Sequence, residues 1–345
     1  MINVGILGLG YWGPNLVRCF SELNDCKVTA VCDQSYDSLI RIKDRFPSVF
    51  PFENFDAMLE RNIVDALVIA TPTSTHFDFA RKALERGIHT FVEKPLAETS
   101  VQCRDLIALA DSKDLTLFVG HVFLHSDPVK KLREIVVSGE LGRISYISSR
   151  RLNLGPIRHD VSSLYDLAPH DISMINYLMG EQPERVTACG LAHLNEKIHD
   201  VCNLSMQFPG NRMGMVHCSW LDPRKERTLT IVGDRKMAIY DDLAQEKIKI
   251  YDKGITAPPT TGSFAEFQIA CRYGGSYSPF VQEREPLKAE CSDFIRCIVE
   301  NVRPTTSGVN GLEVVQVLEA ANESIWDNGA PKDVQSAESL LAEKV

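Results

Sequence analysis

Two short segments of the chain carry side chains that could take part in proton or hydride transfer. The first is Glu93-Lys94-Pro95, which directly follows an apolar segment that ends at Val92. A lysine in this place could donate a hydrogen bond to a hydroxyl or carbonyl oxygen of a bound substrate. An ordinary surface lysine that follows a strand is the alternative, and the segment alone leaves both interpretations open.

The second segment is Asp166-Leu167-Ala168-Pro169-His170. A spacing of four residues places Asp166 and His170 on one face of a helix, where both can point into a cleft. Histidine exchanges protons near neutral pH, and a carboxylate one turn away can orient the ring and stabilise its charged form. The alternative is a helix start, with Asp166 as the cap and a solvated His170. Tyr165 is the next candidate for the base.

Three arginines lie close to this second segment, namely Arg150, Arg151 and Arg158. Arginine binds phosphate and carboxylate groups in a bidentate manner, so these residues are candidates for a clamp on an anionic substrate. A polar strand end is the alternative. Asn153 and Tyr165 complete the candidate substrate contacts. Because no histidine pair or comparable cluster has the spacing of metal ligands, we expect no metal.

The N-terminal residues predict how a cofactor would be held. Gly8, Gly10 and Gly13 follow an apolar segment in the order G-x-G-x-x-G, and a helical pattern comes next. Gly8 would allow the tight turn, Gly10 the approach of a pyrophosphate, and Gly13 close packing of the helix. Asp33 ends a second apolar segment, where a carboxylate binds the hydroxyls of an adenosine ribose. Since no arginine follows Asp33, the sequence predicts NAD rather than NADP.

Elements further along the chain predict where the loops of this domain meet. Apolar strands alternate with helices as far as residue 120, which is typical of a doubly wound parallel sheet. Ligands of such sheets bind at the carboxyl ends of the strands, so the loops at 8–13, 71–76, 93–95 and 120–121 share one rim. The candidate cofactor contacts are Gly8, Gly10, Tyr11, Trp12, Gly13, Asp33, Thr71, Pro72, Thr73, His76, Glu93, Lys94 and His121.

The length of 345 residues fits two domains. We predict a Rossmann domain over 1–120 and a substrate-binding and oligomerisation domain over 121–345, and leave open whether the last helix packs back on the first domain. Strand-like segments between 185 and 240 indicate an open, mostly antiparallel sheet in the second domain. Residues 254–279 are rich in Gly, Pro, Ser and Thr, and predict a long loop.

Composition narrows the class of partner. The formal charge of −9 argues against nucleic acid as a partner. The sequence contains no run of eighteen apolar residues, so we predict no membrane span. The chain begins in a strand without a signal segment, so we expect a cytoplasmic protein. The ten cysteines are scattered without a C-x-x-C pair, which favours reduced thiols. Residues 213–220 and 228–240 are apolar on both alternating faces, so we expect a homodimer or homotetramer.

Taken together, GLGYWGPN, the EKP of 93–95 and the D-x-x-x-H of 166–170 resemble the Gfo/Idh/MocA family. The resemblance implies an NAD(P)-dependent sugar or cyclitol oxidoreductase in which Lys94 and His170 are catalytic and Asp166 supports them. Residues 120–155 and LYDLAPHDIS look like the nucleotide-sugar branch, whose best-defined activity is UDP-N-acetylglucosamine 3-dehydrogenation. Our leading hypothesis is therefore NAD-dependent oxidation of a ring hydroxyl, at C3, of such a nucleotide sugar. The alternatives are an inositol or free-sugar dehydrogenase and, from another class, a non-catalytic NAD-binding regulator.

Overall fold

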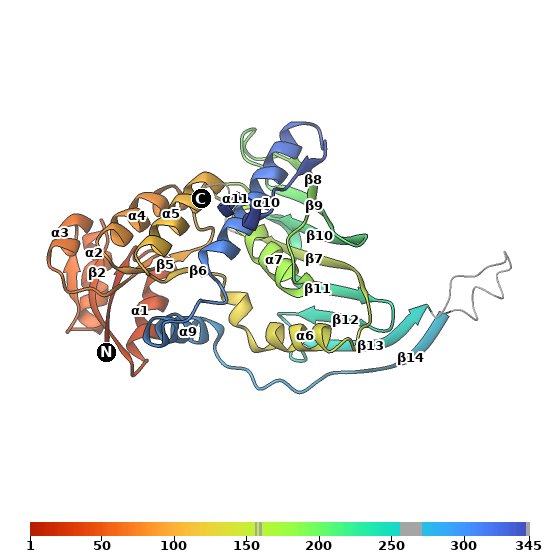
Figure 1. Ribbon diagram of the computed structural model, residues 1–345, viewed down its shortest axis with the longest axis horizontal. Helices are drawn as coiled ribbons and strands as arrows, with labels where there is room; N and C mark the ends of the chain where they lie inside the picture. Colours follow the sequence, from red (N-terminus) through yellow and green to blue (C-terminus); the bar gives the residue numbers. More distant parts are fainter. Residues whose placement is uncertain (156, 159–160, 256–270, 343–345) are drawn as a thin grey trace. The chain divides into compact units, whose positions relative to one another are not determined.

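The computed structural model describes residues 1–155, 157–158, 161–255 and 271–342, and it divides into two compact units. Unit 1 contains Met1–His125, Arg284–Val315 and the chain from Leu341 onward. Unit 2 contains Ser126–Glu283 and Gln316–Leu340. The predicted boundary lies at residue 120, and the prediction leaves open whether the last helix packs back on the first domain. In the structure, unit 1 includes Arg284–Val315. Figure 1 follows the chain through both units.

Unit 1 is built on a six-stranded sheet in the order β3-β2-β1-β4-β5-β6, and all its neighbouring strands are parallel. This confirms the predicted doubly wound sheet. Apart from the edge strand β3, the strands are mostly buried, which accounts for their apolar residues. Their bounds are Ile2–Leu7 (β1), Cys26–Cys32 (β2), Phe50–Phe52 (β3), Ala66–Ile69 (β4), His89–Glu93 (β5) and Leu117–Gly120 (β6).

Helices α2 and α5 of unit 1 begin at recognisable capping residues. Ser35 caps α2 by accepting a hydrogen bond from the Ser38 amide, and Thr99 and Gln102 form a reciprocal capping box at the start of α5. Bounds are Gly13–Ser21 (α1), Tyr36–Arg45 (α2), Phe55–Glu60 (α3), Thr73–Thr75 (η1), His76–Glu85 (α4), Ser100–Ser112 (α5), Val122–His125 (η2) and Pro286–Glu300 (α9).

Helix α9 belongs to unit 1 although it lies far along the sequence. Its Phe294 ring packs edge-on against Phe20, Phe91 and Phe118, at centroid distances of 6.3, 5.6 and 5.5 Å. All four rings are fully buried. Burial of these rings stabilises α9 in the first unit. No local sequence pattern predicts this packing.

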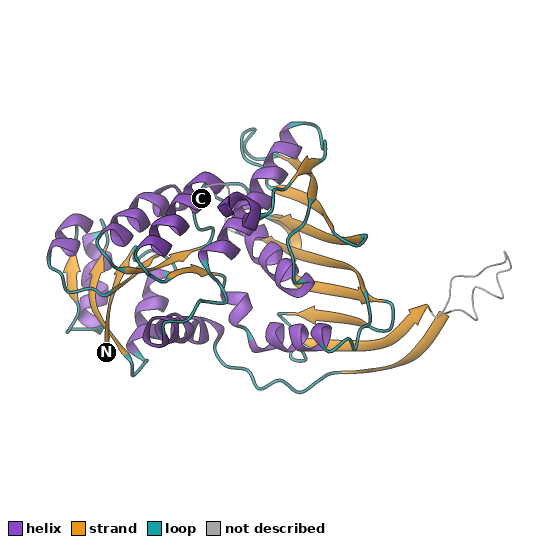
Figure 2. Cartoon of the chain, in the orientation of Figure 1, coloured by secondary structure: helices purple, strands orange, loops and turns teal. Residues whose placement is uncertain are grey.

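Unit 2 contains a nine-stranded sheet in the order β14-β13-β12-β11-β7-β10-β9-β8-β15. Only β7 and β10 are parallel among its described neighbours, which confirms the predicted mostly antiparallel sheet (Figure 2). The strands are Ile144–Leu154 (β7), Arg185–Leu191 (β8), Val201–Phe208 (β9), Arg212–Ser219 (β10), Leu221–Gly233 (β11), Met237–Asp241 (β12), Ile248–Ile255 (β13), Cys271–Tyr277 (β14) and Lys332–Asp333 (β15).

Among the helices described in unit 2, one carries the Asp-x-x-x-His motif. This helix, α7, packs on β7, β9 and β10 and ends at Gly180, which has a φ of +78°. Bounds are Asp127–Val137 (α6), Ser163–Met179 (α7), Gly308–Trp326 (α10, shared with unit 1) and Ala337–Ala342 (α11, which ends in unit 1). No helix in the described ranges is both long and apolar enough to cross a membrane.

The long loop predicted over 254–279 is wrong in part. Strand β13 extends to Ile255 and β14 occupies Cys271–Tyr277, paired with each other in antiparallel register. Residues 272–277 are all exposed, so this edge strand shows no apolar alternation from which it could be predicted. The middle of the predicted loop, 256–270, lies outside the described residues.

Candidate active site

The glycine turn after β1 has the geometry of a dinucleotide site. Gly8 has a φ of +94°, and a Cβ there would lie 2.6 Å from the carbonyl oxygen of Ala70. A Cβ on Gly13 would clash with the carbonyl oxygen of Gly8, whereas one on Gly10 would meet nothing within 4 Å. Two glycines are thus required by the turn itself. Gly10 leaves open space at the helix start, which fits a pyrophosphate.

The carboxylate of Asp33 is fixed at the same rim. Its Oδ2 accepts a hydrogen bond from the Leu9 amide at 2.6 Å, and its Oδ1 accepts one from the Ser35 amide at 2.7 Å. Each carboxylate oxygen has a second lone pair, so both remain able to accept a ribose hydroxyl. Tyr11 is 91% exposed and stacks on the partly buried Trp12 beside this turn.

The carboxyl group of Glu93 packs against Gly120 and Trp12. A Cβ on Gly120 would lie only 2.9 Å from Glu93 Oε2, and the indole of Trp12 donates a hydrogen bond to this carboxylate. Burial raises the pKa of Glu93 to about 7, although Lys94 and Trp12 oppose the shift. Glu290 on α9, fully buried nearby, has its pKa raised well above the ordinary value by burial and by Glu93.

Two histidines that the sequence analysis assigned to the cofactor are each only 1% exposed. His76 lies between two carbonyl oxygens, with Nδ1 2.9 Å from Pro95 O and Nε2 2.9 Å from Thr71 O. Burial lowers the pKa of His121 to about 3, and the charges of Lys94 and His125 add to the shift. Neither ring offers a cofactor appreciable surface, and both lie within electrostatic reach of Lys94.

The loop after β4 contributes the remaining predicted cofactor residues. Pro72 precedes the single turn η1, and the hydroxyl of Thr75 donates to the carbonyl oxygen of Pro72 at 2.7 Å or to Thr71 Oγ1 at 2.8 Å. Thr73 is half-buried and begins η1. The loop is therefore held by its own hydroxyls, and its polar atoms lie at the carboxyl end of β4 as predicted.

In unit 2, Asp166 and His170 share one face of α7, and both are half-buried. Asp166 does not cap the helix. Its Oδ2 accepts a hydrogen bond from Trp220 Nε1 at 3.1 Å, and its Oδ1 lies 3.4 Å from an Nη of Arg158. The carboxylate is held by two donors at the start of the helix, and is therefore pre-oriented one turn from the imidazole.

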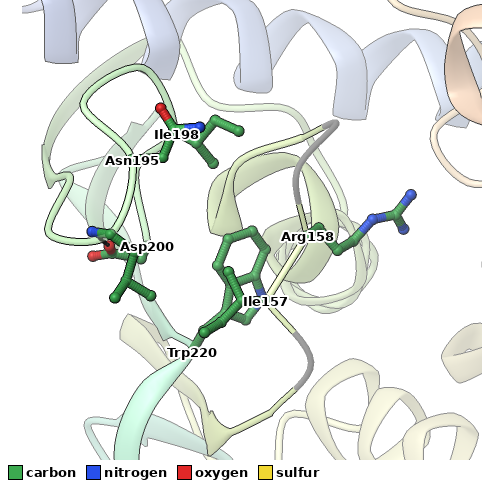
Figure 3. Close-up of a pocket in the computed structure, with 7 residues that line it drawn as sticks. Ile157, Arg158, Asn195, Ile198, Asp200 and Trp220 are labelled. Carbon is green, nitrogen blue, oxygen red and sulfur yellow. Dashed lines mark hydrogen bonds between the residues drawn. The ribbon is translucent and has the colours of Figure 1, made fainter.

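A pocket of about 300 Å³ opens beside this carboxylate (Figure 3). Two of its lining residues, Arg158 and Trp220, are the ones that hold Asp166. Figure 3 shows the guanidinium of Arg158 extending away from Asn195 and Asp200. The walls combine apolar side chains with amide, carboxylate and guanidinium groups; they are Ile157, Arg158, Leu194, Asn195, Ile198, Asp200 and Trp220.

The neighbouring arginines of β7 have opposite environments. Arg150 is exposed and lies 3.5 Å from the carboxylate of Glu226. Arg151 is buried, and its guanidinium bonds to the buried carboxylate of Asp171, which also accepts the hydroxyl hydrogen of Ser149. This contact gives Arg151 a role inside the fold, whereas Arg150 and Arg158 keep their charge accessible. Asn153 and Tyr165 are half-buried.

Sequence reasoning missed Trp220, which follows β10 without any recognisable motif. Its ring is 1% exposed. A buried tryptophan needs an acceptor for its indole N–H, and that requirement was the one signal that it has a polar neighbour. The partner itself, Asp166, lies 54 residues away in the sequence and is identified only by the fold.

A dinucleotide-binding parallel sheet and a second unit with an Asp-x-x-x-His helix over a mostly antiparallel sheet define a two-domain, NAD-binding oxidoreductase. Residues 2–121 match the oxidoreductase family with an NAD-binding Rossmann fold, and residues 129–239 match the GFO/IDH/MocA C-terminal domain. The chain belongs to the GFO/IDH/MocA family, as its motifs predicted.

Two enzymes and two solved structures illustrate the likeness. UDP-N-acetylglucosamine 3-dehydrogenase of Acidithiobacillus ferrooxidans is 25% identical over 91% of this chain and 94% of its own. Its structure has a TM-score of 0.80 at 24% identity, covering 94% and 97%. Myo-inositol 2-dehydrogenase of Thermotoga maritima is 24% identical over 96% and 98%. The WlbA dehydrogenase of Bordetella pertussis, solved with NADH and UDP-GlcNAcA, has a TM-score of 0.80 at 20% identity, covering 97% and 99%.

Proposed function

We propose that this protein is an NAD-dependent dehydrogenase that oxidises a ring hydroxyl, at C3, of a nucleotide-linked N-acetylamino sugar such as UDP-N-acetylglucosamine. The observation that carries the proposal is the Asp166 carboxylate, which is held by Trp220 and Arg158 at the edge of a pocket and lies one helical turn from His170. The full-length similarity to a UDP-N-acetylglucosamine 3-dehydrogenase supports the choice of substrate.

The chemistry divides between the chain and its cofactor. When bound at the glycine turn, NAD⁺ supplies the hydride acceptor. His170 takes the proton of the hydroxyl, and Asp166 stabilises the imidazolium that results. Lys94 donates a hydrogen bond to the same oxygen, which lowers the energy of the developing negative charge.

The pocket in unit 2 fits the part of the substrate that does not react. Its apolar walls suit the flat face of a base or an acetamido methyl group, and the amide of Asn195 suits a polar edge. Arg158 borders the pocket with its side chain 40% exposed, and Arg150 is 56% exposed. We assign the diphosphate to these two guanidinium groups and leave Arg151 out, since it is bound to Asp171.

We also propose that the protein is a homo-oligomer. On the face of the unit 2 sheet opposite the buried core, one row of side chains crosses five strands in register and stays at least partly exposed. A second copy would cover this apolar row. Its residues are Tyr251, Met237, Val232, Tyr146 and Met213.

A substrate panel tests the function directly. The purified protein with NAD⁺ is incubated with UDP-N-acetylglucosamine, other UDP- and dTDP-sugars, free sugars and myo-inositol, and NADH formation is followed by absorbance. NADH and a 3-keto product with the UDP-sugar alone are expected. Turnover of myo-inositol alone would favour the inositol dehydrogenase, a second candidate that the likeness to the Thermotoga enzyme favours. NAD binding without turnover of any substrate would indicate a non-catalytic regulator.

A further inference from the structure

His76, the first residue of α4, bridges two loops that follow different strands. Nδ1 is 2.9 Å from the carbonyl oxygen of Pro95, in the loop after β5. Nε2 is 2.9 Å from the carbonyl oxygen of Thr71, in the loop after β4. The ring is 1% exposed, so the hydrogen bond that its N–H donates is shielded from water. One histidine thus lies between the segment that contains Lys94 and the neighbouring loop of the same rim.

The protonation state of the ring decides to which of the two carbonyl oxygens it donates a hydrogen bond. Burial lowers the pKa of His76, and the charge of Lys94 adds to the effect, although the two carbonyl groups oppose it. A neutral imidazole has a single N–H and can therefore donate to one of the two carbonyl oxygens at a time. The two tautomers bind different loops, and only Nδ1–H binds the loop that contains Lys94.

We propose that His76 is a positioning residue for Lys94, which it holds by donating a hydrogen bond from Nδ1 to Pro95 O. The inference rests on the proposed function, in which Lys94 contacts the reacting oxygen. Pro95 is the next residue after Lys94, so a hydrogen bond to its carbonyl group restrains the turn directly after the lysine. The consequence is that loss of this hydrogen bond displaces the Lys94 ammonium, whereas loss of the contact with Thr71 acts on the loop that packs against Gly8.

Two substitutions separate the two hydrogen bonds. The side-chain nitrogen of asparagine lies where Nδ1 was, and that of glutamine lies where Nε2 was. H76N therefore keeps the donor to Pro95 O, H76Q keeps the donor to Thr71 O, and H76L removes both. We expect kcat about 10- to 100-fold lower in H76Q and H76L, and a smaller loss in H76N. The dissociation constant for NAD⁺ should stay within about threefold in H76Q, which keeps the bond to the loop after β4.

A matched control uses a histidine at the start of β5, the strand that ends just before Lys94. His89 is half-buried at the start of β5, where its Nδ1 accepts a hydrogen bond from the Thr116 amide at 3.0 Å. H89N should lower thermal stability and leave kcat unchanged. A general weakening of unit 1 would therefore affect both histidine positions, whereas a positioning effect on Lys94 would appear only at His76.

A second measurement does not depend on substrate. Acetic anhydride labels lysine amines at a rate set by their exposure and basicity, and mass spectrometry reads each site. The labelling rate of Lys94 should change in H76Q and H76L and stay near wild type in H76N, while that of the exposed Lys82 on α4 stays constant. If no sugar is turned over, the proposed function fails, but this labelling still tests His76. Equal Lys94 labelling in all variants, or H76Q matching wild type while H76N does not, would overturn the inference.

Discussion

The indole nitrogen Nε1 of Trp220 lies 3.1 Å from Oδ2 of Asp166, and this contact joins the end of β10 to the helix that carries the proposed base. Arg158 holds the other oxygen of the same carboxylate at 3.4 Å. Asp166 therefore does not rotate freely, and its charge is held on the face of α7 that His170 shares. The role of Asp166 in orienting His170 can therefore be tested separately from the role of His170 as the base.

The first prediction concerns the base. His170→Asn should lower kcat about 10²- to 10⁴-fold, the usual cost of losing a general base, while the affinity for NAD⁺ is retained. Turnover by stopped-flow absorbance and NAD⁺ affinity by calorimetry measure the two quantities. Near-normal turnover of this variant between about pH 6 and 9 would show that another group is the base, and Tyr165 would be tested next.

The order of effects among neighbouring groups is part of the same test. Lys94→Met should also lower kcat, because a hydrogen bond to the reacting oxygen is lost in the transition state. Asp166→Asn should be less harmful, since this side chain orients and charges its neighbour. Trp220→Phe is the variant to compare with Asp166→Asn. It removes the N–H donor to Asp166 and keeps an aromatic ring, so it tests the hydrogen bond that orients the carboxylate.

The second prediction concerns the cofactor. Asp33→Ala should weaken NAD⁺ binding more than NADP⁺ binding, because the carboxylate that accepts the ribose hydroxyls is lost. The substitution also removes the acceptor of the Leu9 and Ser35 amides. Asp33→Asn, which keeps one acceptor oxygen in place, separates the two effects. Calorimetric titration with both cofactors is the measurement, and equal or tighter NADP⁺ binding by the intact protein would contradict the assignment.

The third prediction separates the arginines. Arg150→Ala should raise KM for the nucleotide sugar and change kcat little. Arg158→Ala should raise KM and also lower kcat, because Arg158 holds the carboxylate of Asp166. Arg151→Ala should instead destabilise the fold by about 3–5 kcal/mol, because it leaves the buried Asp171 carboxylate without its counter-charge. Urea denaturation and steady-state kinetics on the three variants test this. An Arg151 variant of normal stability with a raised KM would return this residue to the substrate site.

The fourth prediction concerns pH and Glu93. Burial raises the pKa of this carboxyl group from 4.5 to about 7, so the folded state binds its proton more tightly than the unfolded state. The contribution of Glu93 to the free energy of unfolding is therefore fully present below about pH 4.5. Up to about 3 kcal/mol of it is lost as the pH rises to 7. Glu93→Gln should gain stability over wild type at pH 8 and not at pH 4.5. A constant difference between the two proteins across this range would contradict the assignment.

The fifth prediction concerns association through the apolar row of the unit 2 sheet. Light scattering at micromolar concentration should give the mass of a dimer or tetramer. Met213→Glu, which places a charge in the row, should shift the protein toward monomer. Val137→Glu is the control, because Val137 is 67% exposed on α6 and lies outside the row. A monomeric wild-type protein would refute the proposal.

Much of unit 1 could be predicted from the sequence alone. Buried parallel strands, helical spacing and capping residues are local patterns, and so is the order of Gly8, Gly10, Gly13 and Asp33. The same holds for Asp166 and His170, because a spacing of four residues on a helix fixes their common face whatever surrounds it. These features depend on residues close in the chain.

Contacts between distant residues were decided by the tertiary structure. The bond between Trp220 and Asp166, the burial of Arg151 on Asp171, and the return of Phe294 to the first unit join residues far apart in the sequence. Arg150 and Arg151 have the same side chain and are neighbours in the sequence. Because side chains alternate along β7 and α7 covers one face, Arg150 is exposed and Arg151 is buried. His76 is likewise an ordinary histidine in the sequence. Its position between two carbonyl oxygens exists only because β4 and β5 are adjacent in the sheet.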